Sequence, residues 1–571
     1  MPIEIIGLIA YNQPSTEEFF GRWANRSMAH DTEGVAFTER DESVRQQAAE
    51  YDHEYRQYQN GLRTDTAFRT RRIAYGVHHQ RPPSEQYMIR VKIPYGLATT
   101  RQWRTLARVA KNYHSSLHLT TRQAIELHNV SLEATPAVVS ALAAEGLSTC
   151  DAGGNGIRNV TACPLIGICP RQAFNPVAIM RQFVRGHLNT GIQAPLPKKV
   201  KMGVSGCGED CLGVRSQDIG VVARNRCDQA GFRIYVGGGI GSAPQSGTLF
   251  EDFVPAAELG TWMDAIVLSY RIIGERDDRH HARLKWLVAD LGMQAFHEFV
   301  VRYRNKLVVS ENPTDHGTFR RNDEGGSPSA SNLSRYSSLL GEWVKQRVWT
   351  LSEDQVAVRV PVAGGMMPPD EMSELAAITE NYGSAQLSIT TMQEFVIRNI
   401  PSVNLPPVYA ALHAWGPERM TSVPSLISCA GSPACNLALT RSQDLTQVLR
   451  RMMAADADCE QAAQDPRLSV RISGCPHSCS HARVAPLGLI GGSLHVKNLR
   501  GSVPVYTIWI GGSEQRECVR VGVPVARIPA RRVPEALRRL FHAYVAERKP
   551  GEGFEAWSRN RWHLNTEEGE A

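Results

Sequence analysis

Four cysteines in the last third of the chain have the residue type and spacing of a metal site. Cys429 and Cys435 lie in CAGSPAC with C-x5-C spacing, and Cys475 and Cys479 lie in SGCPHSC with C-x3-C spacing. A [4Fe–4S] cluster takes one thiolate for each iron, so these cysteines form a complete ligand set. The long gap between the two pairs indicates that two separate turns of a folded domain hold the cluster.

Zinc and disulfide bonds are the two alternatives for these thiols. Zinc ribbons usually place their cysteines at C-x2-4-C spacing, and disulfides need an oxidising compartment. The start of the sequence, MPIEIIGLIAYNQ, lacks the basic and apolar regions of a secretory signal. No apolar stretch is long enough to predict a membrane span. We therefore expect a cytoplasmic protein, in which twelve cysteines indicate metal or redox chemistry.

Composition and charge limit the classes of function. The chain has 571 residues, of which 42% are hydrophobic and 21% are charged, as in soluble proteins with several domains. The net charge of +6 has no accompanying nucleic-acid-binding motif, so we expect no nucleic-acid partner. A basic surface is suited to an acidic electron donor. We expect much of the excess charge to lie inside, around an anionic cofactor.

The sequence repeats itself. Residues 87–142 resemble residues 355–412, with Arg90 aligned with Arg359 and LTT aligned with ITT. The cysteine segments repeat as well, because LPKKVKMGVSGCGEDC parallels DPRLSVRISGCPHSC. The first copy of this set contains Cys163, Cys169, Cys207 and Cys211. One duplicated unit predicts a pseudo-twofold arrangement with a site at the junction of the two halves.

Hydrophobic periodicity predicts the elements that position these residues. In each small repeat we expect a strand (MIRVKIP or VAVRVPV), a helix (RQWRTLARVAKNY or DEMSELAAITENY) and a second strand (SLHLTT or QLSITT). Each larger segment mixes strands such as FRIYVGGG with helices such as EALRRLFHAYVAER. The class is therefore α+β or mixed α/β. Residues 310–335 are polar and rich in Gly, Ser and Asn, as in a linker.

In combination, these motifs resemble the sulfite and nitrite reductase haemoproteins. The similarity covers roughly residues 65–560 and includes LTTRQ, IRNVTAC, LPKKVK and VGGG. It implies an α+β, internally duplicated fold: two ferredoxin-like small domains and two larger sirohaem-binding α/β domains around a pseudo-twofold axis. The predicted segments are an N-terminal extension (1–64), the first ferredoxin-like half-domain (65–148), the first sirohaem-binding domain (149–309), a linker (310–348), the second ferredoxin-like half-domain (349–418) and the [4Fe–4S]/sirohaem-binding domain (419–571).

The resemblance also implies the roles of particular residues. Cys429, Cys435, Cys475 and Cys479 would ligate one [4Fe–4S] cluster, and Cys479 would bridge it to the sirohaem iron. Four cations would lie over the distal face of the sirohaem and hold the substrate, namely Arg90, Arg158, Lys199 and Lys201. Arginine offers a planar fork of donors to an oxyanion, whereas lysine is a compact charge that also donates a proton.

Sirohaem carries eight carboxylates, and burying them requires cations and backbone donors. The candidates for these contacts are Thr120, Arg122, Gln123, Gly237, Gly238, Gly239 and Lys285. Met392 stands in the second copy where Arg122 stands in the first, so we expect the first half to supply the sirohaem and substrate contacts. Glu126 would be repelled by sirohaem carboxylates, which predicts that it is protonated or turned away.

The first-half cysteines have two interpretations. They form a complete ligand set for a second cluster. Alternatively, they are a remnant of the duplication whose thiols pack as small hydrophobic groups. The usual one-cluster pattern of the family favours the remnant.

The function implied is the six-electron reduction of sulfite to sulfide, with electrons from a separate ferredoxin or flavoprotein reductase. Reduction of nitrite to ammonia is the main alternative. Plant-type nitrite reductases often carry Asn where this chain has Lys201, and a fourth cation suits the more highly charged sulfite. A CobG-like oxygenase of cobalamin synthesis is a remote alternative with the same fold. A simple iron–sulfur electron carrier would not need the four cations.

Overall fold

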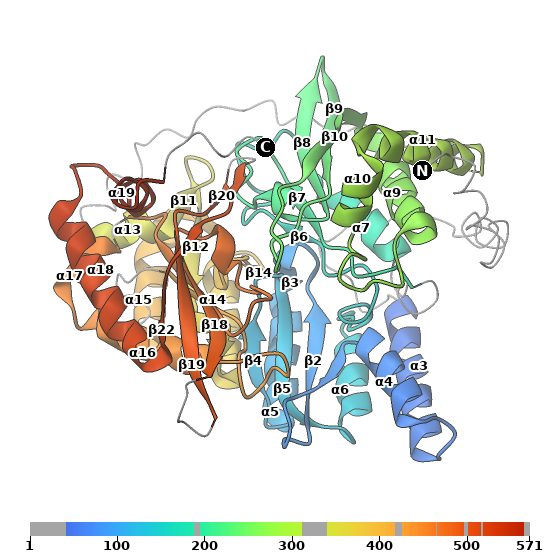
Figure 1. Cartoon of the computed structure of the whole chain (residues 1–571), viewed down its shortest axis with the longest axis horizontal. Coiled ribbons are helices and arrows are strands. Elements are labelled where there is room, and N and C mark those ends of the chain that lie inside the picture. The colour runs from blue at the N-terminus through green and yellow to red at the C-terminus, as the bar shows by residue number, and fades with distance from the viewer. Residues whose placement is uncertain are drawn as a thin grey trace.

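Four five-stranded sheets and the helices that cover them make up the described part of the chain (Figure 1). The computed structural model describes residues 42–187, 195–310, 340–416, 425–463, 465–495, 501–515 and 518–564. The sheets form two pairs with matching strand order, which confirms the predicted duplicated α+β class. Residues 1–41 of the predicted extension and 311–339 of the predicted linker lie outside the described residues.

The first small sheet is antiparallel and has the strand order β1-β2-β5-β4-β13. Its strands are β1 (Val77–His79), β2 (Gln86–Lys92), β5 (Ala124–Ser131), β4 (Ser116–Leu119) and β13 (Met366–Met367). Its helices are α3 (Glu42–Gln59), α4 (Asp65–Ala74), α5 (Thr100–Asn112) and α6 (Thr135–Ala143). Helix α5 begins in a capping box, in which the Thr99 hydroxyl and the Gln102 side chain bind each other's backbone N–H.

The second small sheet repeats this arrangement with the order β11-β12-β15-β14-β3. Its strands are β11 (Val348–Thr350), β12 (Gln355–Pro361), β15 (Glu394–Pro401), β14 (Gln386–Ile389) and β3 (Leu97–Thr99). Its helices are α13 (Glu342–Arg347), α14 (Pro369–Tyr382) and α15 (Leu405–Trp415). The predicted strand–helix–strand order is therefore present in both copies.

The two small sheets exchange their edge strands. Strand β3 comes from the first half but pairs with β14 of the second, with Ala98 opposite Leu387. Strand β13 makes the reciprocal exchange and pairs with β4, with Met367 opposite Leu117. Helices α5 and α14 also pack against each other. Each half therefore completes the other's sheet, and separation would expose two strand edges.

Two buried glutamines stabilise the exchange of edge strands through hydrogen bonds. Gln123 donates to the carbonyls of Ala162 (3.0 Å) and Ile389 (2.8 Å), and accepts from the Ala162 N–H (2.7 Å). The pseudo-symmetric Gln393 makes the same three bonds, to Leu119 O, Ser428 O and Ser428 N. Both side chains are fully buried. Each amide thus joins a strand of one half to a loop or strand of the other.

The two larger sheets have the orders β10-β9-β8-β7-β6 and β16-β17-β18-β19-β22. The first contains β6 (Thr161–Ala162), β7 (Met202–Ser205), β8 (Ile219–Arg226), β9 (Gln229–Val236) and β10 (Thr248–Pro255). The second contains β16 (Ser425–Ser428), β17 (Ser469–Ser473), β18 (Leu487–His495), β19 (Ser502–Ile510) and β22 (Val523–Pro529). In each sheet the first three strands in sequence are parallel, and the last two pair antiparallel.

Helices accompany both larger sheets. The first domain has α7 (Val177–Gly186), α9 (Leu259–Ile273), α10 (Leu284–Leu291) and α11 (Met293–Ser310). The second has α16 (Ser442–Ala454), α17 (Ala457–Ala462), α18 (Val533–Glu547) and α19 (Phe554–Arg561), and a hairpin of β20 (Ser513–Gln515) and β21 (Cys518–Arg520). Among the described helices, none is both long and apolar enough to cross a membrane.

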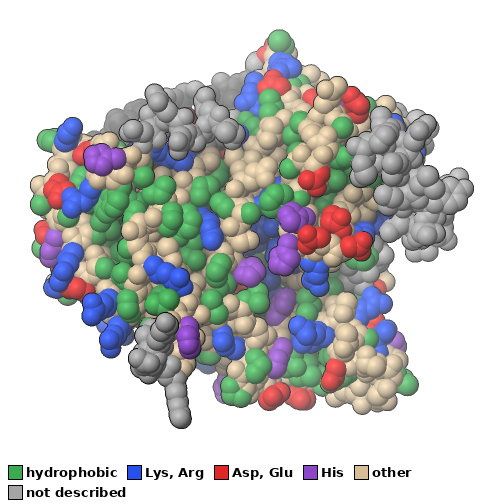
Figure 2. Space-filling model, viewed as in Figure 1, with side chains coloured by type: hydrophobic (Ala, Val, Ile, Leu, Met, Phe, Trp, Pro, Cys, Tyr) green, Lys and Arg blue, Asp and Glu red, His purple; other side chains and the backbone are tan. Residues whose placement is uncertain are grey.

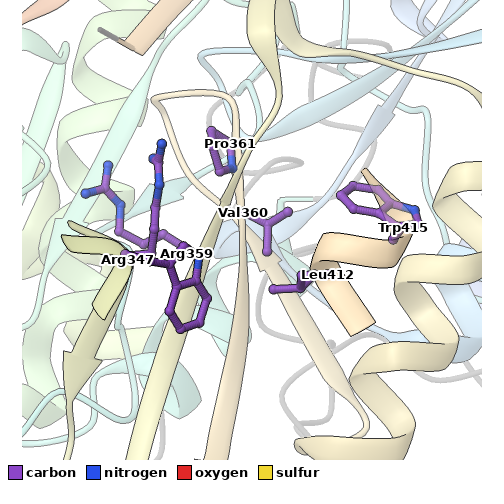
Figure 3. A pocket seen from close by; sticks show the side chains of 7 residues that line it. Arg347, Arg359, Val360, Pro361, Leu412 and Trp415 are labelled. Carbon is purple, nitrogen blue, oxygen red and sulfur yellow. The ribbon is translucent and has the colours of Figure 1, made fainter. Parts of the chain in front are cut away.

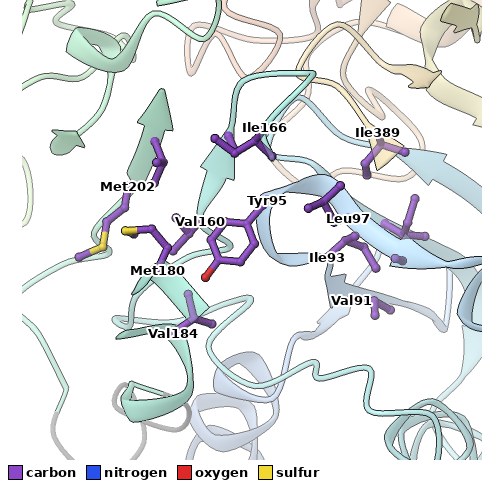
Figure 4. Close-up of a cluster of buried hydrophobic side chains, with 14 of the residues drawn as sticks. Val91, Ile93, Tyr95, Leu97, Val160, Ile166, Met180, Val184, Met202 and Ile389 are labelled. Carbon is purple, nitrogen blue, oxygen red and sulfur yellow. The ribbon is translucent and has the colours of Figure 1, made fainter. Parts of the chain in front are cut away.

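A continuous apolar core joins the small and larger domains. Figure 4 shows Ile93, Tyr95 and Leu97 from the segment after β2 packed among Val160, Met180 and Met202 of the first larger domain. Ile389 of the second half closes the same cluster. Burial of this kind contributes on the order of 2 kcal/mol for each large side chain. The core therefore fixes the interdomain junction at which the candidate site lies.

Candidate active site

The second-half cysteines lie at the carboxyl ends of neighbouring parallel strands. Cys429 follows β16 directly, and Cys475 follows β17 after one glycine. The Cys429 N–H donates to Ile472 O (3.1 Å), and the Gly474 N–H points at the Cys429 sulfur (3.1 Å). Parallel strands end at the same edge of a sheet, so the two turns present their thiols together.

These four thiols are free and influence one another electrostatically. The pKa of Cys429 is raised to about 12 by burial and by Cys479, and the pKa of Cys475 to about 11 by burial, Cys479 and Cys435. Metal binding requires the thiolate form, so a cluster would have to displace these protons. What suits a ligand set is the placement of the thiols at the common edge of two parallel strands. The arrangement fits the predicted [4Fe–4S] cluster.

Cys479 lies against the first half of the molecule. The Thr121 hydroxyl donates to the Cys479 carbonyl (2.7 Å). The sequence prediction named Thr120 and Gln123 on either side of this contact but missed Thr121. The feature of the sequence that could have identified Thr121 is its place as the second threonine of the TTRQ motif. The Thr120 hydroxyl instead bonds Ala124 O (3.0 Å) and holds its own turn.

Lys199 and Lys201 lie in the electrostatic field of Cys479. Burial, Arg158 and Arg283 lower the pKa of Lys199 to about 8, whereas Cys479 acts in the opposite direction. The pKa of Lys201 is held well below its ordinary range by burial, followed by Arg122 and Arg283. Neither ammonium has a hydrogen-bond partner among the described residues. Both are therefore available to an anion placed between them and Cys479.

Arg122 lies beside the two lysines. Its guanidinium donates to Gln217 Oε1 (2.7 Å), and more weakly to Thr161 Oγ1 and Met202 O. Burial lowers its pKa to about 10. All of these acceptors are neutral, so the charge of Arg122 is oriented without being paired.

Arg283 joins this group although the sequence prediction missed it. It donates three hydrogen bonds of 2.6–2.9 Å to the fully buried Asp218, which also accepts from the Lys201 backbone N–H (2.8 Å). Asp218 thereby fixes the backbone at Lys201, directly before β7. Arg283 lies two residues before the predicted Lys285, and no local motif distinguishes it in the sequence.

Arg158 is held by the loop that precedes it. Its two terminal nitrogens donate to the carbonyls of Asp151, Gly153, Gly154 and Gly156 at 2.7–3.4 Å. Burial, followed by Arg90, lowers its pKa to about 9. A buried guanidinium satisfied by neutral carbonyls keeps its full positive field.

Arg90 is the predicted distal cation that has a direct anionic partner. Its Nε and Nη2 donate to Glu126 Oε1 at 3.0 and 2.7 Å, and Nη1 donates to Ala152 O (2.8 Å). Although burial alone would raise it, the pKa of Glu126 is held well below its usual value by Arg90 and His118. Of the two predicted alternatives, the protonated form is wrong, and the carboxylate is instead turned to Arg90, its partner on the neighbouring strand.

Glu126 is also the centre of a buried histidine group. His118 Nδ1 lies 2.9 Å and His128 Nε2 lies 3.5 Å from Glu126 Oε2. His118 Nε2 lies 3.3 Å from Ser428 O, next to Cys429. This network connects Arg90 to the turn that carries the cluster cysteines.

The predicted glycines differ in what constrains them. Gly237 has a positive φ of 82°, and a Cβ at Gly238 would lie 2.2–2.3 Å from the Arg215 and Gln217 carbonyls. A Cβ at Gly239 would meet Arg283 Nη2 at 3.5 Å and the Lys285 side chain at 3.8 Å. The left-handed backbone favours glycine at position 237, and the close carbonyls require it at position 238. Gly239 leaves the backbone open beside the cation group.

Lys285 lies at the edge of this group. Its ammonium bonds Ala243 O and stacks 4.9 Å from the centre of the Trp286 ring. Burial and Arg283 lower its pKa. The cation is therefore partly satisfied by the protein.

The charge balance of this region fits sirohaem. Five cations lie close together here and form the cation group: Arg122, Arg158, Lys199, Lys201 and Arg283. Among the described residues, the carboxylate that pairs directly with one of them is Asp218. Such an excess of buried positive charge suits a polyanion. On the face shown in Figure 2, cationic and histidine side chains also gather between the two halves.

A separate small pocket lies in the second ferredoxin-like half (Figure 3). It is lined by Trp343, Arg347, Arg359, Val360, Pro361, Leu412 and Trp415. Arg359 is paired with Glu394 (2.6 Å) and stacks on Trp349. The pocket contains no cysteine and none of the predicted site residues.

Two models of known protein families match this chain. The family described as "Nitrite/Sulfite reductase ferredoxin-like half domain" matches residues 78–145 and 351–415. The family described as "Nitrite and sulphite reductase 4Fe-4S domain" matches residues 153–307. The chain belongs to the nitrite and sulfite reductase family. It is therefore an oxidoreductase, and its family implies sirohaem and a [4Fe–4S] cluster as cofactors.

Individual relatives include both activities. The chain is 28% identical to the assimilatory ferredoxin-dependent nitrite reductase of Haloferax mediterranei, over 86% of this chain and 84% of that protein. It is 25% identical to sulfite reductase [ferredoxin] 1 of Mycolicibacterium paratuberculosis, over 83% and 82%. The NirA protein of Mycobacterium tuberculosis shares the fold, with a TM-score of 0.73, 23% identity, and coverage of 87% and 91%.

Proposed function

We propose that this reductase converts sulfite to sulfide by a six-electron reduction. The observation that carries the proposal is the pair of lysines beside Cys479, whose ammonium groups have no hydrogen-bond partner among the described residues. Fully ionised sulfite carries two negative charges and nitrite carries one. A second free lysine, Lys201, therefore contributes more to binding sulfite than to binding nitrite.

The cofactors would divide between the two halves. Cys429, Cys435, Cys475 and Cys479 would hold the [4Fe–4S] cluster, with Cys479 shared with the sirohaem. The cation group around Arg122 would balance the sirohaem carboxylates. When bound, these cofactors supply one-electron transfers and an iron with an open coordination position.

The residues of this chain would bind the oxyanion and move protons. Arg158 and Arg90 are held in place by protein acceptors, so they act as fixed positive charges where oxygen leaves. Lys199, with a pKa of about 8, is charged near neutral pH and still able to donate its proton. Lys201, two residues further along the segment that leads into β7, would bind the same oxyanion.

The electron donor would be ferredoxin. The Haloferax and Mycolicibacterium relatives are both named for ferredoxin.

Nitrite reduction to ammonia is the second candidate. It is supported by the Haloferax relative, which is named as a nitrite reductase. The same cofactors and cations would serve, since that reaction also uses six electrons and releases oxygen as water.

The test is the product that purified reductase forms from sulfite or nitrite with an artificial donor. Sulfite reduction at a higher kcat/KM than nitrite reduction, with one sulfide formed per sulfite, would support the proposal. A higher kcat/KM for nitrite, with ammonia as product, would reverse the substrate assignment. Activity with neither anion, in protein that contains sirohaem, would exclude both.

A further inference from the structure

The backbone hydrogen bonds around the first-half cysteines match those around the second-half cysteines. The Cys163 N–H donates to Val204 O (3.1 Å), and the Cys169 N–H donates to Leu165 O (2.9 Å). The Gly206 N–H points at the Cys163 sulfur (3.5 Å). The corresponding bonds of the second half are Cys429 N to Ile472 O (3.1 Å), Cys435 N to Gly431 O (2.8 Å) and Gly474 N to Cys429 Sγ (3.1 Å). The duplication has therefore preserved the turns as well as the cysteine spacing.

The turn that follows the third cysteine is repeated too. Asp210 N–H donates to Cys207 O (3.2 Å), and Gly213 N–H donates to Asp210 O (3.2 Å). Gly213 is left-handed, with a φ of 71°. The matching features are Ser478 N to Cys475 O (3.3 Å), His481 N to Ser478 O (2.9 Å) and the left-handed His481. Both turns thus present the pair at C-x3-C spacing in one geometry.

The first-half thiols are not packed as a duplication remnant would be. Cys163 is buried, but Cys169 and Cys207 are partly exposed and Cys211 is exposed. None is in a disulfide. Cys169 and Cys207 share a side-chain hydrogen bond, and Cys211 lies in the electrostatic field of Cys169. Four neighbouring thiols, three of which are at least partly exposed, are a ligand set rather than a hydrophobic cluster.

The spacing of the sulfurs favours a cluster over a single zinc ion. Tetrahedral zinc with Zn–S distances of about 2.3 Å brings its sulfurs to within about 4 Å of one another. Among the described residues, no three cysteine sulfurs lie within 4.8 Å of one another. The three potential metal ligands that do lie this close together are His118, Glu126 and His128. A cubane fills the space between its four thiolates and accepts the wider set.

A buried arginine in the facing half has donors without partners. Arg398 is 2% exposed, and its Nη2 donates to Ile166 O (2.7 Å), inside the C-x5-C turn. Its Nε and Nη1 have no hydrogen-bond partner among the described residues. Its charge acts on Cys163. An unpaired buried guanidinium is costly, and four thiolates around a [4Fe–4S] core supply the net negative charge that would compensate it.

The first-half set has no sirohaem-binding surroundings. Met392 replaces Arg122, and Arg471 Nη2 lies 3.4 Å from its sulfur. Arg471 and His481 both pair with the buried Glu514, at 2.7 and 3.0 Å. A Cβ on Gly213 would lie 2.5 Å from Glu514 Cγ. Protein side chains therefore fill the space that corresponds to the cation group of the first half.

We infer that Cys163, Cys169, Cys207 and Cys211 hold a second [4Fe–4S] cluster, which is not joined to sirohaem. Binding replaces the proton of each thiol with an iron bond. The backbone N–H that points at Cys163 and the charge of Arg398 would stabilise the negatively charged cluster. This inference is independent of whether sulfite or nitrite is the substrate.

The first test is the acid-labile sulfide content of the holoenzyme purified without oxygen, relative to its sirohaem. Two clusters give about eight sulfides per sirohaem, and one cluster gives about four. The reduced enzyme should also show the electron paramagnetic resonance signal of a cluster uncoupled from haem. About four sulfides without that signal, or bound zinc in place of the missing iron, would overturn the inference.

The second test uses variants of the exposed ligands. The double variant Cys169→Ser/Cys211→Ser should lose about half of the sulfide and the uncoupled signal, but keep its sirohaem absorption. The matched control is Cys227→Ser, an exposed cysteine outside both sets, which should retain all of the sulfide. Unchanged sulfide in the double variant would contradict the inference. Loss of both cofactors would indicate misfolding, and the wild-type sulfide ratio then decides alone.

Discussion

Lys201 is the residue on which the choice of substrate depends. It lies in the field of Cys479 and beside Arg122, and its ammonium has no hydrogen-bond partner among the described residues. A bound anion favours the charged form of Lys201, and the substitution Lys201→Asn removes that charge but keeps a hydrogen-bond donor. We expect kcat/KM for sulfite to fall by roughly 100-fold and that for nitrite by less than about 10-fold.

Steady-state kinetics with both anions and one artificial donor measure this difference. The matched control is Lys198→Asn, which changes the adjacent lysine, whose ammonium bonds Arg279 O. Equal losses for the two anions in Lys201→Asn would show that Lys201 does not discriminate between them.

The lowered pKa of Lys199 predicts that substrate binding depends on pH. Its pKa is lowered to about 8, so the ammonium loses its charge as the pH rises through that value. We expect the KM for the anion to rise above about pH 8, or somewhat higher because bound anions stabilise the charged form. In Lys199→Arg the rise should disappear from the range up to about pH 10. A KM profile that is the same in both proteins would exclude Lys199 from the binding site.

Glu126 contributes stability that depends on pH. Its folded pKa lies below the ordinary 4.5, so its ion pair with Arg90 stabilises the fold above that pH and is lost as the pH falls further. Glu126→Gln leaves Arg90 without an anionic partner, and we expect it to lower the free energy of unfolding by about 3 kcal/mol at pH 7. Urea unfolding at pH 7 and pH 4 measures the change, which should shrink at pH 4.

Glu374→Gln is the control for this experiment, because Glu374 is an exposed carboxylate on α14. Its substitution should leave the urea midpoint unchanged at both pH values. If Glu126→Gln lowered the free energy of unfolding more at pH 4 than at pH 7, Glu126 would not be an ionised partner of Arg90.

At the scale of elements, the strand exchange ties the two halves together through Gln123 and Gln393. Replacing either by Leu keeps the volume but leaves two carbonyls and one N–H unpaired in a buried place. We expect each substitution to lower the free energy of unfolding by about 3 kcal/mol. Because the bonds are pseudo-symmetric, the two losses should be similar when measured by urea unfolding.

The control for the glutamine variants is Gln294→Leu on α11, where the side chain is exposed and bonds Glu298 within the helix. It should shift the urea midpoint little. A loss confined to one of the two buried glutamines would show that only one of the two junctions limits stability.

The sequence predicted the elements better than their pairing. Alternation and helical periodicity indicated β2, α5 and β4, because each pattern is local and depends on one apolar face. The exchange of β3 and β13 had no such signal, since these two strands are only two or three residues long. The pairing of Arg90 with Glu126 also depends on register, which is why the sequence could not choose between a protonated Glu126 and one turned away from the cofactor.

The sequence predicted the cysteines of the candidate site but missed two residues that act through partners distant in sequence. The spacing of the cysteines identified residues that the structure places at the ends of parallel strands. Arg283 and Thr121 were missed, because each acts through a neighbour distant in sequence: Asp218 and the Cys479 carbonyl. Gln123 was predicted as a cofactor contact, whereas the structure uses its amide on backbone groups of both halves.

At the scale of the whole molecule, the duplication separates two tasks. The first half contributes the cation group, and the second contributes the cysteines next to it, so the proposed site exists only where the halves meet. Electrons must reach this junction from a partner that docks on the surface. Basic side chains that lie on the surface, such as Arg539 and Arg441, suit an acidic donor.

This charge predicts that the reaction with ferredoxin is sensitive to salt. Raising the ionic strength from about 0.01 to 0.15 M shortens the Debye length from about 30 to 8 Å and screens the attraction. At saturating sulfite, we expect kcat/KM for reduced ferredoxin to fall by roughly 10-fold over this range. The same salt series with a small artificial donor should change the rate by less than about 2-fold, because it lacks the many acidic charges of a protein donor. A ferredoxin rate that does not respond to salt would show that docking is not electrostatic, and the donor would then have to be recognised through apolar contacts.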